Sequence, residues 1–236
     1  MTQVNYYFRQ LISRAGALLS ADKNLGLLQR VRADGLTDLE HTALNDLYQR
    51  VKHAPTGAIV EAGCALGGSA IVMAAAKDHD RPFYIFDAFG MIPPPSEQDE
   101  ADAHERYENI VTGNAQGIRG EVYYGYQEDL LSKVITSFKQ YDLEPDSHNV
   151  QFVKGFYEDA LHIDEPVAVA HIDCDWYDSV IVCLERITPY LVEGGVLVID
   201  DYEAWSGCKK AVDDFFAGRQ NEFEFVNKSR LHIIRK

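Results

Sequence analysis

The sequence has few basic residues and no long apolar run, and each absence argues against a class of protein. Its 22 lysines and arginines stand against 37 aspartates and glutamates, which gives 236 residues a net charge of −15. Because no block of five or six basic residues occurs, we expect no nucleic-acid partner. No apolar stretch reaches the roughly 20 residues of a membrane helix, and Arg9 and Arg14 lie where a signal peptide is apolar. We therefore predict a cytoplasmic protein with no membrane partner.

Cysteine is also scarce, and its spacing argues against two kinds of structural cross-link. The four cysteines include no Cys-x-x-Cys pair. A zinc knuckle or a disulfide framework is therefore not expected. Hydrophobic residues make up 46% of the chain and aromatic residues 11%, enough for a self-sufficient core. At this length we expect a single domain over residues 1–236.

The first 55 residues are predicted to be helical. Apolar residues between Val4 and Leu19 recur at steps of three and four, which places them on one stripe of a helix. That stripe has to be covered, either by the same subunit or by a sister subunit in a homodimer formed through this N-terminal helix. Thr37 and Glu40 have the spacing of a capping box, which predicts the start of a second helix.

From residue 58 onward, apolar strands alternate with helices. Strands that are apolar on both faces and separated by helices are typical of a parallel sheet with helices on both sides. We therefore predict an α/β fold with a doubly wound, mostly parallel seven-stranded sheet that a final antiparallel pair closes. The expected strands are 58–61, 83–86, 150–153, 167–172, 196–199, 223–226 and 231–234, and the expected helices are 69–76, 130–141, 179–191 and 208–217, with a short helical piece near residue 160.

Residues 90–128 interrupt this alternation. The segment has three consecutive prolines and many acidic residues, but little sustained periodicity. A stretch this long inside a compact domain is usually a lid or a binding insertion. We predict a lid or substrate insertion, with a disordered loop as the alternative.

The residues that follow the first three strands suggest a site for an adenosine-bearing ligand. In doubly wound sheets, ligands bind outside the carboxyl ends of the strands. Gly63 ends the first strand, and Asp87 ends the second, where an acid can accept both ribose hydroxyls. The dinucleotide motif Gly-x-Gly-x-x-Gly is not present, because Ala65 occupies the second glycine's place. After the third strand, Gly155, Phe156 and Tyr157 offer a glycine and two rings for an adenine, although core packing explains Phe156 equally well.

Three carboxylates follow the fourth and fifth strands. Asp173 ends one strand, and Asp200 and Asp201 end the next. Adjacent strands lie about 4.8 Å apart, so these side chains are expected to be neighbours. Two carboxylates about 4 Å apart repel by about 4 kcal/mol at an effective dielectric of 20. Such a trio calls for a shared proton or a hard divalent cation such as Mg²⁺ or Ca²⁺, whereas the alternative is a set of solvated helix caps.

Two further residue types near these acids have less specific roles. His171 lies on the same strand face as Asp173, and we expect it to be a hydrogen-bonded structural histidine rather than a base. Trp176 and Trp205 follow the acids by a few residues, where they can wall a substrate pocket or simply pack.

These segments together resemble the macrocin O-methyltransferase family, over about residues 36–216. The likeness is carried by Glu61-Ala-Gly63 with Gly67-Gly68-Ser69, by Asp87-Ala-Phe89-Gly90, by Lys154-Gly155, by His171-Ile-Asp173-Cys-Asp175-Trp-Tyr177-Asp-Ser179, by Asp200-Asp201-Tyr202 and by Lys210-Ala-Val-Asp213-Asp-Phe215. The resemblance implies a Rossmann-like class I methyltransferase fold and Mg²⁺-dependent methylation of a hydroxyl, commonly on a sugar of a glycosylated natural product.

The resemblance also implies a role for individual residues. Asp173, Asp200 and Asp201 would hold Mg²⁺, and Asp173 would also be the general base. The sequence departs from the family pattern at Cys64-Ala65-Leu66, Cys174 and Trp176, which puts the substrate pocket in doubt but leaves the metal ligands intact. The residues expected to bind S-adenosylmethionine are Glu61, Gly63, Cys64, Ala65, Ser69, Asp87, Gly155, Phe156, Tyr157 and Asp173.

Three other functions remain open at this point. A catechol or phenol acceptor would suit the same mechanism, because its two oxygens can chelate the metal. A nicotinamide-dependent dehydrogenase can use the same sheet, but it has no use for three aspartates around a metal. A non-catalytic ligand-binding descendant is the third alternative, and the intact metal ligands count against it.

Overall fold

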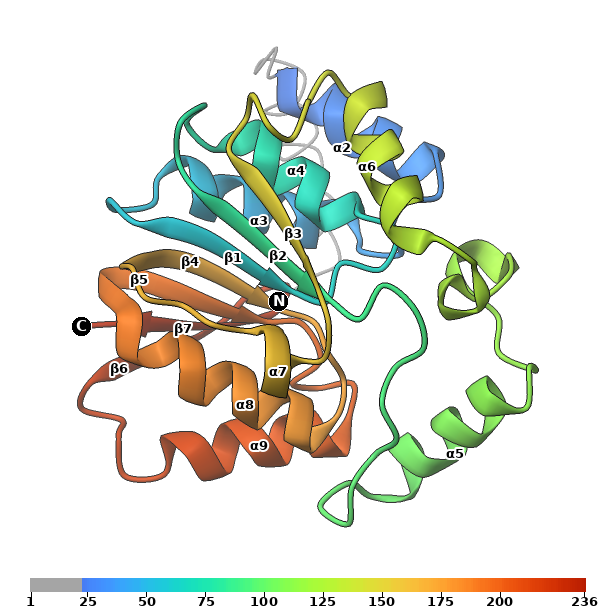
Figure 1. The fold of residues 1–236 in the computed structure, drawn as a ribbon. Coiled ribbons are helices and arrows are strands. Elements are labelled where there is room, and N and C mark those ends of the chain that lie inside the picture. The colour runs from blue at the N-terminus through green and yellow to red at the C-terminus, as the bar shows by residue number, and fades with distance from the viewer. Residues whose placement is uncertain (1–22) are drawn as a thin grey trace, which may run out of the picture.

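A computed structural model describes residues 23–236 as one twisted seven-stranded sheet between two layers of helices (Figure 1). The strand order is β3-β2-β1-β4-β5-β7-β6, and β7 runs antiparallel to both of its neighbours, β5 and β6. The predicted doubly wound sheet and its closing pair are confirmed. The strands are β1 (Ala58–Ala62), β2 (Phe83–Asp87), β3 (Val150–Lys154), β4 (Val167–Ile172), β5 (Leu191–Ile199), β6 (Phe223–Asn227) and β7 (Leu231–Arg235).

Helices cover both faces of this sheet. In Figure 1, α2, α3, α4 and α6 lie above the sheet, and α7, α8 and α9 lie below it. Three short 3-10 turns join these elements. The helices are α2 (Lys23–Ala33), α3 (His41–Lys52), α4 (Gly68–Ala76), α5 (Ala101–Val111), α6 (Leu130–Gln140), α7 (Tyr157–Ala160), α8 (Tyr177–Ile187) and α9 (Ser206–Phe216), and the turns are η1 (Ile118–Gly120), η2 (Tyr124–Tyr126) and η3 (Thr188–Tyr190).

The central strands are buried on both faces, as the continuous apolar runs predict. Every residue of β1 and β4 is buried. Alternate strand residues enter two separate cores. Ile59 and Val169 pack under α3 and α4, whereas Val60 and Ala170 pack against α8 and α9. The strand order reverses between β1 and β4, and a doubly wound sheet binds its ligands at the carboxyl edge of that switch point.

Two of the expected helix boundaries are wrong. The predicted capping box at Thr37 does not start a helix, because α3 begins at His41 and the Thr37 hydroxyl accepts the Leu39 N–H at 3.1 Å. The Glu40 carboxylate instead contacts Arg230 at 3.3 Å. The expected helix 179–191 ends at Ile187, since Pro189 follows, and β5 starts at Leu191 rather than at 196.

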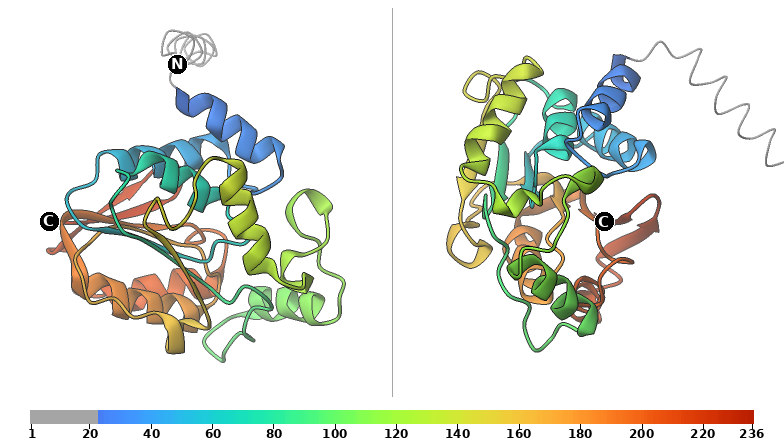
Figure 2. Two further views of the ribbon diagram at one scale, coloured as in Figure 1. Left: turned by 45° about the horizontal axis from the view of Figure 1, so that its top comes forward. Right: turned by 90° about the vertical axis from the view of Figure 1, so that its right-hand side faces the viewer.

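The insertion 90–128 lies beside the carboxyl edge of the sheet and contains a helix that the sequence did not predict. In the left view of Figure 2, α5 of this segment lies to the right of the sheet, beyond the ends of the strands. Tyr124 of this segment packs against the main core, and other contacts with the rest of the protein are polar. Asp102 accepts the N–H and the hydroxyl of Ser206 at 2.9 and 2.6 Å, and Asp99 accepts the N–H of Tyr177 at 2.8 Å.

The predicted N-terminal stripe from Val4 to Leu19 lies outside the described residues, and with it the suggested dimer contact. In the part of the chain that is described, no helix combines the length and the apolarity that crossing a bilayer requires. All four cysteines are free, in agreement with their spacing.

Candidate active site

The loop after β1 can approach the end of β4 only because it begins with glycine. Gly63 has a φ of +90°, and a Cβ there would lie 1.8 Å from the carbonyl oxygen of Asp173. Its N–H donates to the carbonyl of Phe86 at 2.9 Å. The loop therefore lies against the ends of both neighbouring strands, and α4 begins five residues later, at Gly68.

Asp87, at the end of β2, fastens this loop. One of its carboxylate oxygens accepts the N–H groups of Cys64 and Ala65 at 2.8 and 3.2 Å, and the other accepts the N–H of Phe89 at 2.6 Å. Burial raises the pKa of Asp87, and these three backbone donors oppose that rise. Asp87 thus has a structural function in addition to lining the first cavity described below.

A cavity of about 680 Å³ opens between the ends of β1, β2, β3 and β4. It brings together seven of the ten residues predicted to bind the cofactor. Its lining also includes Trp176 and, from the insertion, Ile92, Pro93 and Tyr124. The predicted cofactor residues that line it are Gly63, Ala65, Asp87, Gly155, Phe156, Tyr157 and Asp173.

A second cavity of about 630 Å³ lies on the other side of Asp173. Two more of the predicted cofactor residues, Cys64 and Ser69, line it, together with Asp200 and Arg230. The two cavities share Asp173 as well as Ala65 and Tyr124. Asp173 therefore lies between two spaces that can each take a ligand.

Glu61 lies under this site and lines neither cavity. Its side chain is fully buried, and one carboxylate oxygen lies 2.9 Å from Nδ1 of His171. On the other side, Nε2 of His171 lies 3.5 Å from Asp200. Burial opposes a charge on His171, but the two carboxylates raise its pKa to about 10. The predicted structural histidine is therefore a buried cation between two acids.

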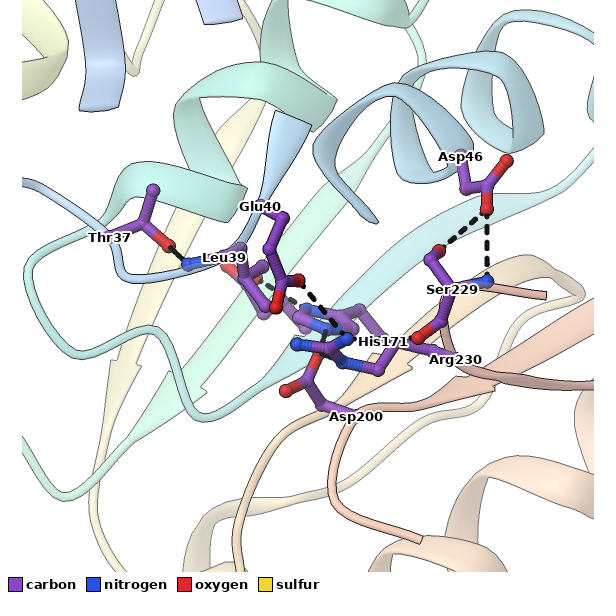
Figure 3. A network of polar contacts seen from close by, with 9 residues as sticks. Thr37, Leu39, Glu40, Asp46, His171, Asp200, Ser229 and Arg230 are labelled. Carbon is purple, nitrogen blue, oxygen red and sulfur yellow. Dashed lines mark hydrogen bonds and ion pairs between the residues drawn. The ribbon is translucent and has the colours of Figure 1, made fainter. Parts of the chain in front are cut away.

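Asp200 has a second cationic neighbour that the sequence did not reveal. Nε of Arg230 donates to Oδ1 of Asp200 at 2.7 Å, and the same guanidinium contacts Glu40 (Figure 3). The Ser229 hydroxyl donates to Asp46 on α3 at 2.6 Å, which ties the β6–β7 turn to that helix. Although burial acts in the opposite direction, His171 and Arg230 lower the pKa of Asp200.

The predicted carboxylate trio is close together, but the structure distributes it over two overlapping groups. One group consists of His171, Asp173 and Asp200, and the other of Asp173, Asp175 and Asp201, with ligand atoms within 4.8 Å of one another in each. Burial and neighbouring carboxylates raise the pKa of Asp173 and of Asp201 well above their usual values. Asp175 belongs to the second group, although it was not predicted as a metal ligand and entered only as part of the motif that runs from His171 to Ser179.

The insertion covers this edge of the sheet through an aromatic pair. Nε1 of Trp176 donates to the carbonyl of Pro93 at 3.1 Å, and the ring of Trp205 packs edge-on against Trp176 with centroids 5.3 Å apart. Trp176 lines the first cavity, which is one of the two roles expected for it. Trp205 does not line that cavity and packs against Trp176.

Comparison with known proteins gives one family. The family described as "Macrocin-O-methyltransferase (TylF)" matches residues 36–226. The 8-demethyl-8-(2,3-dimethoxy-alpha-L-rhamnosyl)-tetracenomycin-C 4'-O-methyltransferase of Streptomyces olivaceus is 32% identical over 165 residues, which are 67% of this chain and 58% of that protein. The mycinamicin III 3''-O-methyltransferase of Micromonospora griseorubida is 26% identical over 76% of this chain and 66% of its own length. The chain thus spans less than two thirds of these relatives.

A solved structure supports the same likeness. The O-methyltransferase NovP superposes with a TM-score of 0.69 at 26% identity, over 85% of this chain and 82% of that one. The calicheamicin methyltransferase CalS11 superposes with a TM-score of 0.59 at 15% identity, which is evidence for the fold alone.

Proposed function

The chain belongs to the macrocin O-methyltransferase family, and from this premise we propose that it is a Mg²⁺-dependent O-methyltransferase that takes its methyl group from S-adenosylmethionine. The acceptor we propose is a hydroxyl of a small molecule, most simply a sugar hydroxyl of a glycosylated natural product. One observation carries the proposal: Asp173, in a cluster of acids, separates two cavities of about 680 and 630 Å³.

The donor set fits a hard divalent cation. Asp173, Asp200 and Asp201 would hold it, since carboxylate oxygens are the ligands that Mg²⁺ prefers. Oδ2 of Asp201 is buried and has no hydrogen-bond partner among residues 23–236, which leaves a carboxylate oxygen for a ligand. When bound there, the cation would lower the pKa of a coordinated hydroxyl.

The first cavity suits the cofactor, whose sulfonium supplies an electrophilic methyl group. Gly63 lets the backbone approach the ligand closely, and Asp87 would accept the ribose hydroxyls. Gly155, Phe156 and Tyr157 line the cavity after β3, and the exposed ring of Phe156 would stack on the adenine. In this arrangement Asp173 would lie at the boundary between the cofactor and the second cavity.

The second cavity would hold the acceptor, and the chain's own residues would align it. Holding the acceptor oxygen in line with the methyl group contributes up to about 7–11 kcal/mol as effective molarity. Asp173 would take the proton of that hydroxyl, because it is the carboxylate common to both cavities. Tyr124, which also lines both, would close the site with the rest of the insertion and exclude water.

The test is turnover by an Asp200→Asn variant and by the wild type in excess chelator, with mass spectrometry of rhamnosyl glycosides and of catechols as acceptors. We expect both conditions to abolish methyl transfer, while the affinity for S-adenosylmethionine stays within a few-fold, because the metal serves the hydroxyl and not the adenosine. Undiminished turnover in chelator would end the metal mechanism. Methylation of catechols but not of glycosides would replace the sugar acceptor with a phenol.

A further inference from the structure

The carboxylate cluster at the sheet edge has two halves that differ in how their charge is compensated. Asp173 belongs to both. The first half adds His171 and Asp200, and the second adds Asp175 and Asp201. A cation bound by the protein is needed most where the chain supplies no positive charge of its own.

The first half is already compensated. Oδ1 of Asp200 lies 2.7 Å from Nε of Arg230 and 3.5 Å from Nε2 of His171. Only 10% of the Asp200 side chain is exposed, so little water screens these contacts. The Arg230 guanidinium therefore already compensates the charge of Asp200, and the His171 imidazole lies beside the same carboxylate.

The second half has no such partner. Within residues 23–236, no lysine, arginine or histidine nitrogen lies within 4.0 Å of a carboxylate oxygen of Asp173, Asp175 or Asp201. Of these three acids, His171 lies within 4.8 Å of Asp173 alone, and the positive charge that acts on Asp175 is the more distant one of Arg106 on α5, whose guanidinium lies over the ring of Tyr123. Asp173 and Asp175 are partly buried and Asp201 is buried, and carboxylates this close repel one another unless protons or a cation intervene.

The orphaned oxygen points to a ligand in this half. Oδ2 of Asp201 is buried, has no hydrogen-bond partner, and belongs to a residue that is 7% exposed. Asp175 has a φ of +60°, a left-handed conformation that is uncommon for residues other than glycine. Strained backbone of this kind persists where the surroundings hold it and is concentrated at functional sites.

We infer that Asp175 is a further ligand of the divalent cation, so that Asp173, Asp175 and Asp201 form the half of the cluster where the cation is bound most directly. This inference rests on the proposed function. Arg230 and His171 then serve as the counter-ions of Asp200, and Asp200 contributes less to metal affinity than Asp175 does.

The experiment measures Mn²⁺ binding to the full-length protein without cofactor or acceptor, from the electron paramagnetic resonance signal of free Mn²⁺. We expect Asp175→Asn to weaken Mn²⁺ binding about tenfold or more, and more than Asp200→Asn does. Asparagine tolerates a left-handed backbone at least as well as aspartate, so the variant should keep its fold, which circular dichroism checks. The matched control is Asp178→Asn, which removes an equal charge from the exposed first turn of α8 and should leave affinity within twofold.

A second readout separates a ligand from a mere nearby charge. Electron spin-echo spectroscopy in D₂O counts the waters on bound Mn²⁺, and loss of a ligand adds about one water, whereas loss of a distant charge adds none. Wild-type binding with unchanged affinity or hydration in Asp175→Asn overturns this inference and leaves the proposed function standing. No Mn²⁺ binding by the wild type at millimolar concentration overturns the metal part of the proposed function itself.

Discussion

Two fully buried histidines occupy the same level of the sheet, and their pKa values are shifted in opposite directions. His171 on β4 and His232 on β7 both pair with Val198 of β5 between them. His171 lies between Glu61 and Asp200, and its pKa is raised to about 10. Nδ1 of His232 accepts a hydrogen bond from Arg50 at 2.9 Å, and burial together with that charge lowers its pKa to about 4.

The difference shows that neighbours, and not depth, set the charge of a buried group at this edge. His171 is a cation because the acids of the candidate site surround it, and it is part of the charge balance of that site. His232 faces helix α3, where an arginine already supplies the positive charge. The protein therefore offsets part of the negative charge at this edge of the sheet with one of its own buried side chains, His171.

The largest effect is expected from removing these two imidazoles in turn. His171→Gln should lower the free energy of unfolding by about 3–5 kcal/mol, because the buried Glu61 carboxylate loses its cation and Asp200 keeps only Arg230. His232→Gln should cost about 1–2 kcal/mol, since only a neutral hydrogen-bond acceptor is lost. Urea denaturation at pH 7 in chelator, which keeps any metal out of the comparison, measures both. Equal losses would mean that the two sites do not differ in charge.

Much of the scaffold around these histidines could be predicted from the sequence. β4 has its predicted bounds, and the closing β6–β7 pair lies where alternating apolar residues placed it. Helix α5 could not be found in this way, because only Ala103 and Ile110 among its residues are buried. It is held by polar contacts such as that of Asp102 with Ser206, which leave no apolar stripe in the sequence.

The candidate site was predictable to the extent that it follows from strand ends. Asp173, Asp200 and Asp201 come together because neighbouring parallel strands end at one edge. Arg230 was not predictable, since it reaches Asp200 only through the pairing of the final hairpin. Glu40 was assigned to a capping box because that local pattern gives no sign of a partner 190 residues away.

A smaller effect should follow when one acid beside His171 is neutralised. Glu61→Gln keeps the shape of the side chain but removes the charge 2.9 Å from Nδ1. We expect the pKa of His171 to fall by about 1–3 units, because one of its two carboxylate partners no longer favours the charged form. Nitrogen-15 NMR of labelled histidines follows the titration, with His232 in the same sample as the control. A His171 pKa that stays near 10 would assign the whole shift to Asp200.

The smallest effect is expected at His232, as a change of stability with pH. Its pKa is about 4 in the folded protein and about 6.5 in the unfolded chain, so the unfolded chain binds the proton more readily between these values. The stability that depends on a neutral His232 is therefore complete above pH 6.5 and is lost as the pH falls toward 4.

The difference in free energy of unfolding between His232→Gln and the wild type should accordingly shrink by about 1 kcal/mol between pH 7 and pH 5.5. For Arg50→Met, we expect a smaller change with pH in its stability difference from the wild type, because burial still lowers the pKa of His232 when the positive charge is gone. Urea denaturation of the three proteins at several pH values measures these differences. Subtracting the wild-type free energy of unfolding at each pH removes the contribution of carboxylates that titrate in the same range. If the free energies of unfolding of His232→Gln and the wild type differ by the same amount at every pH, His232 does not titrate in this window. The contrast between the two histidines would then rest only on the raised pKa of His171.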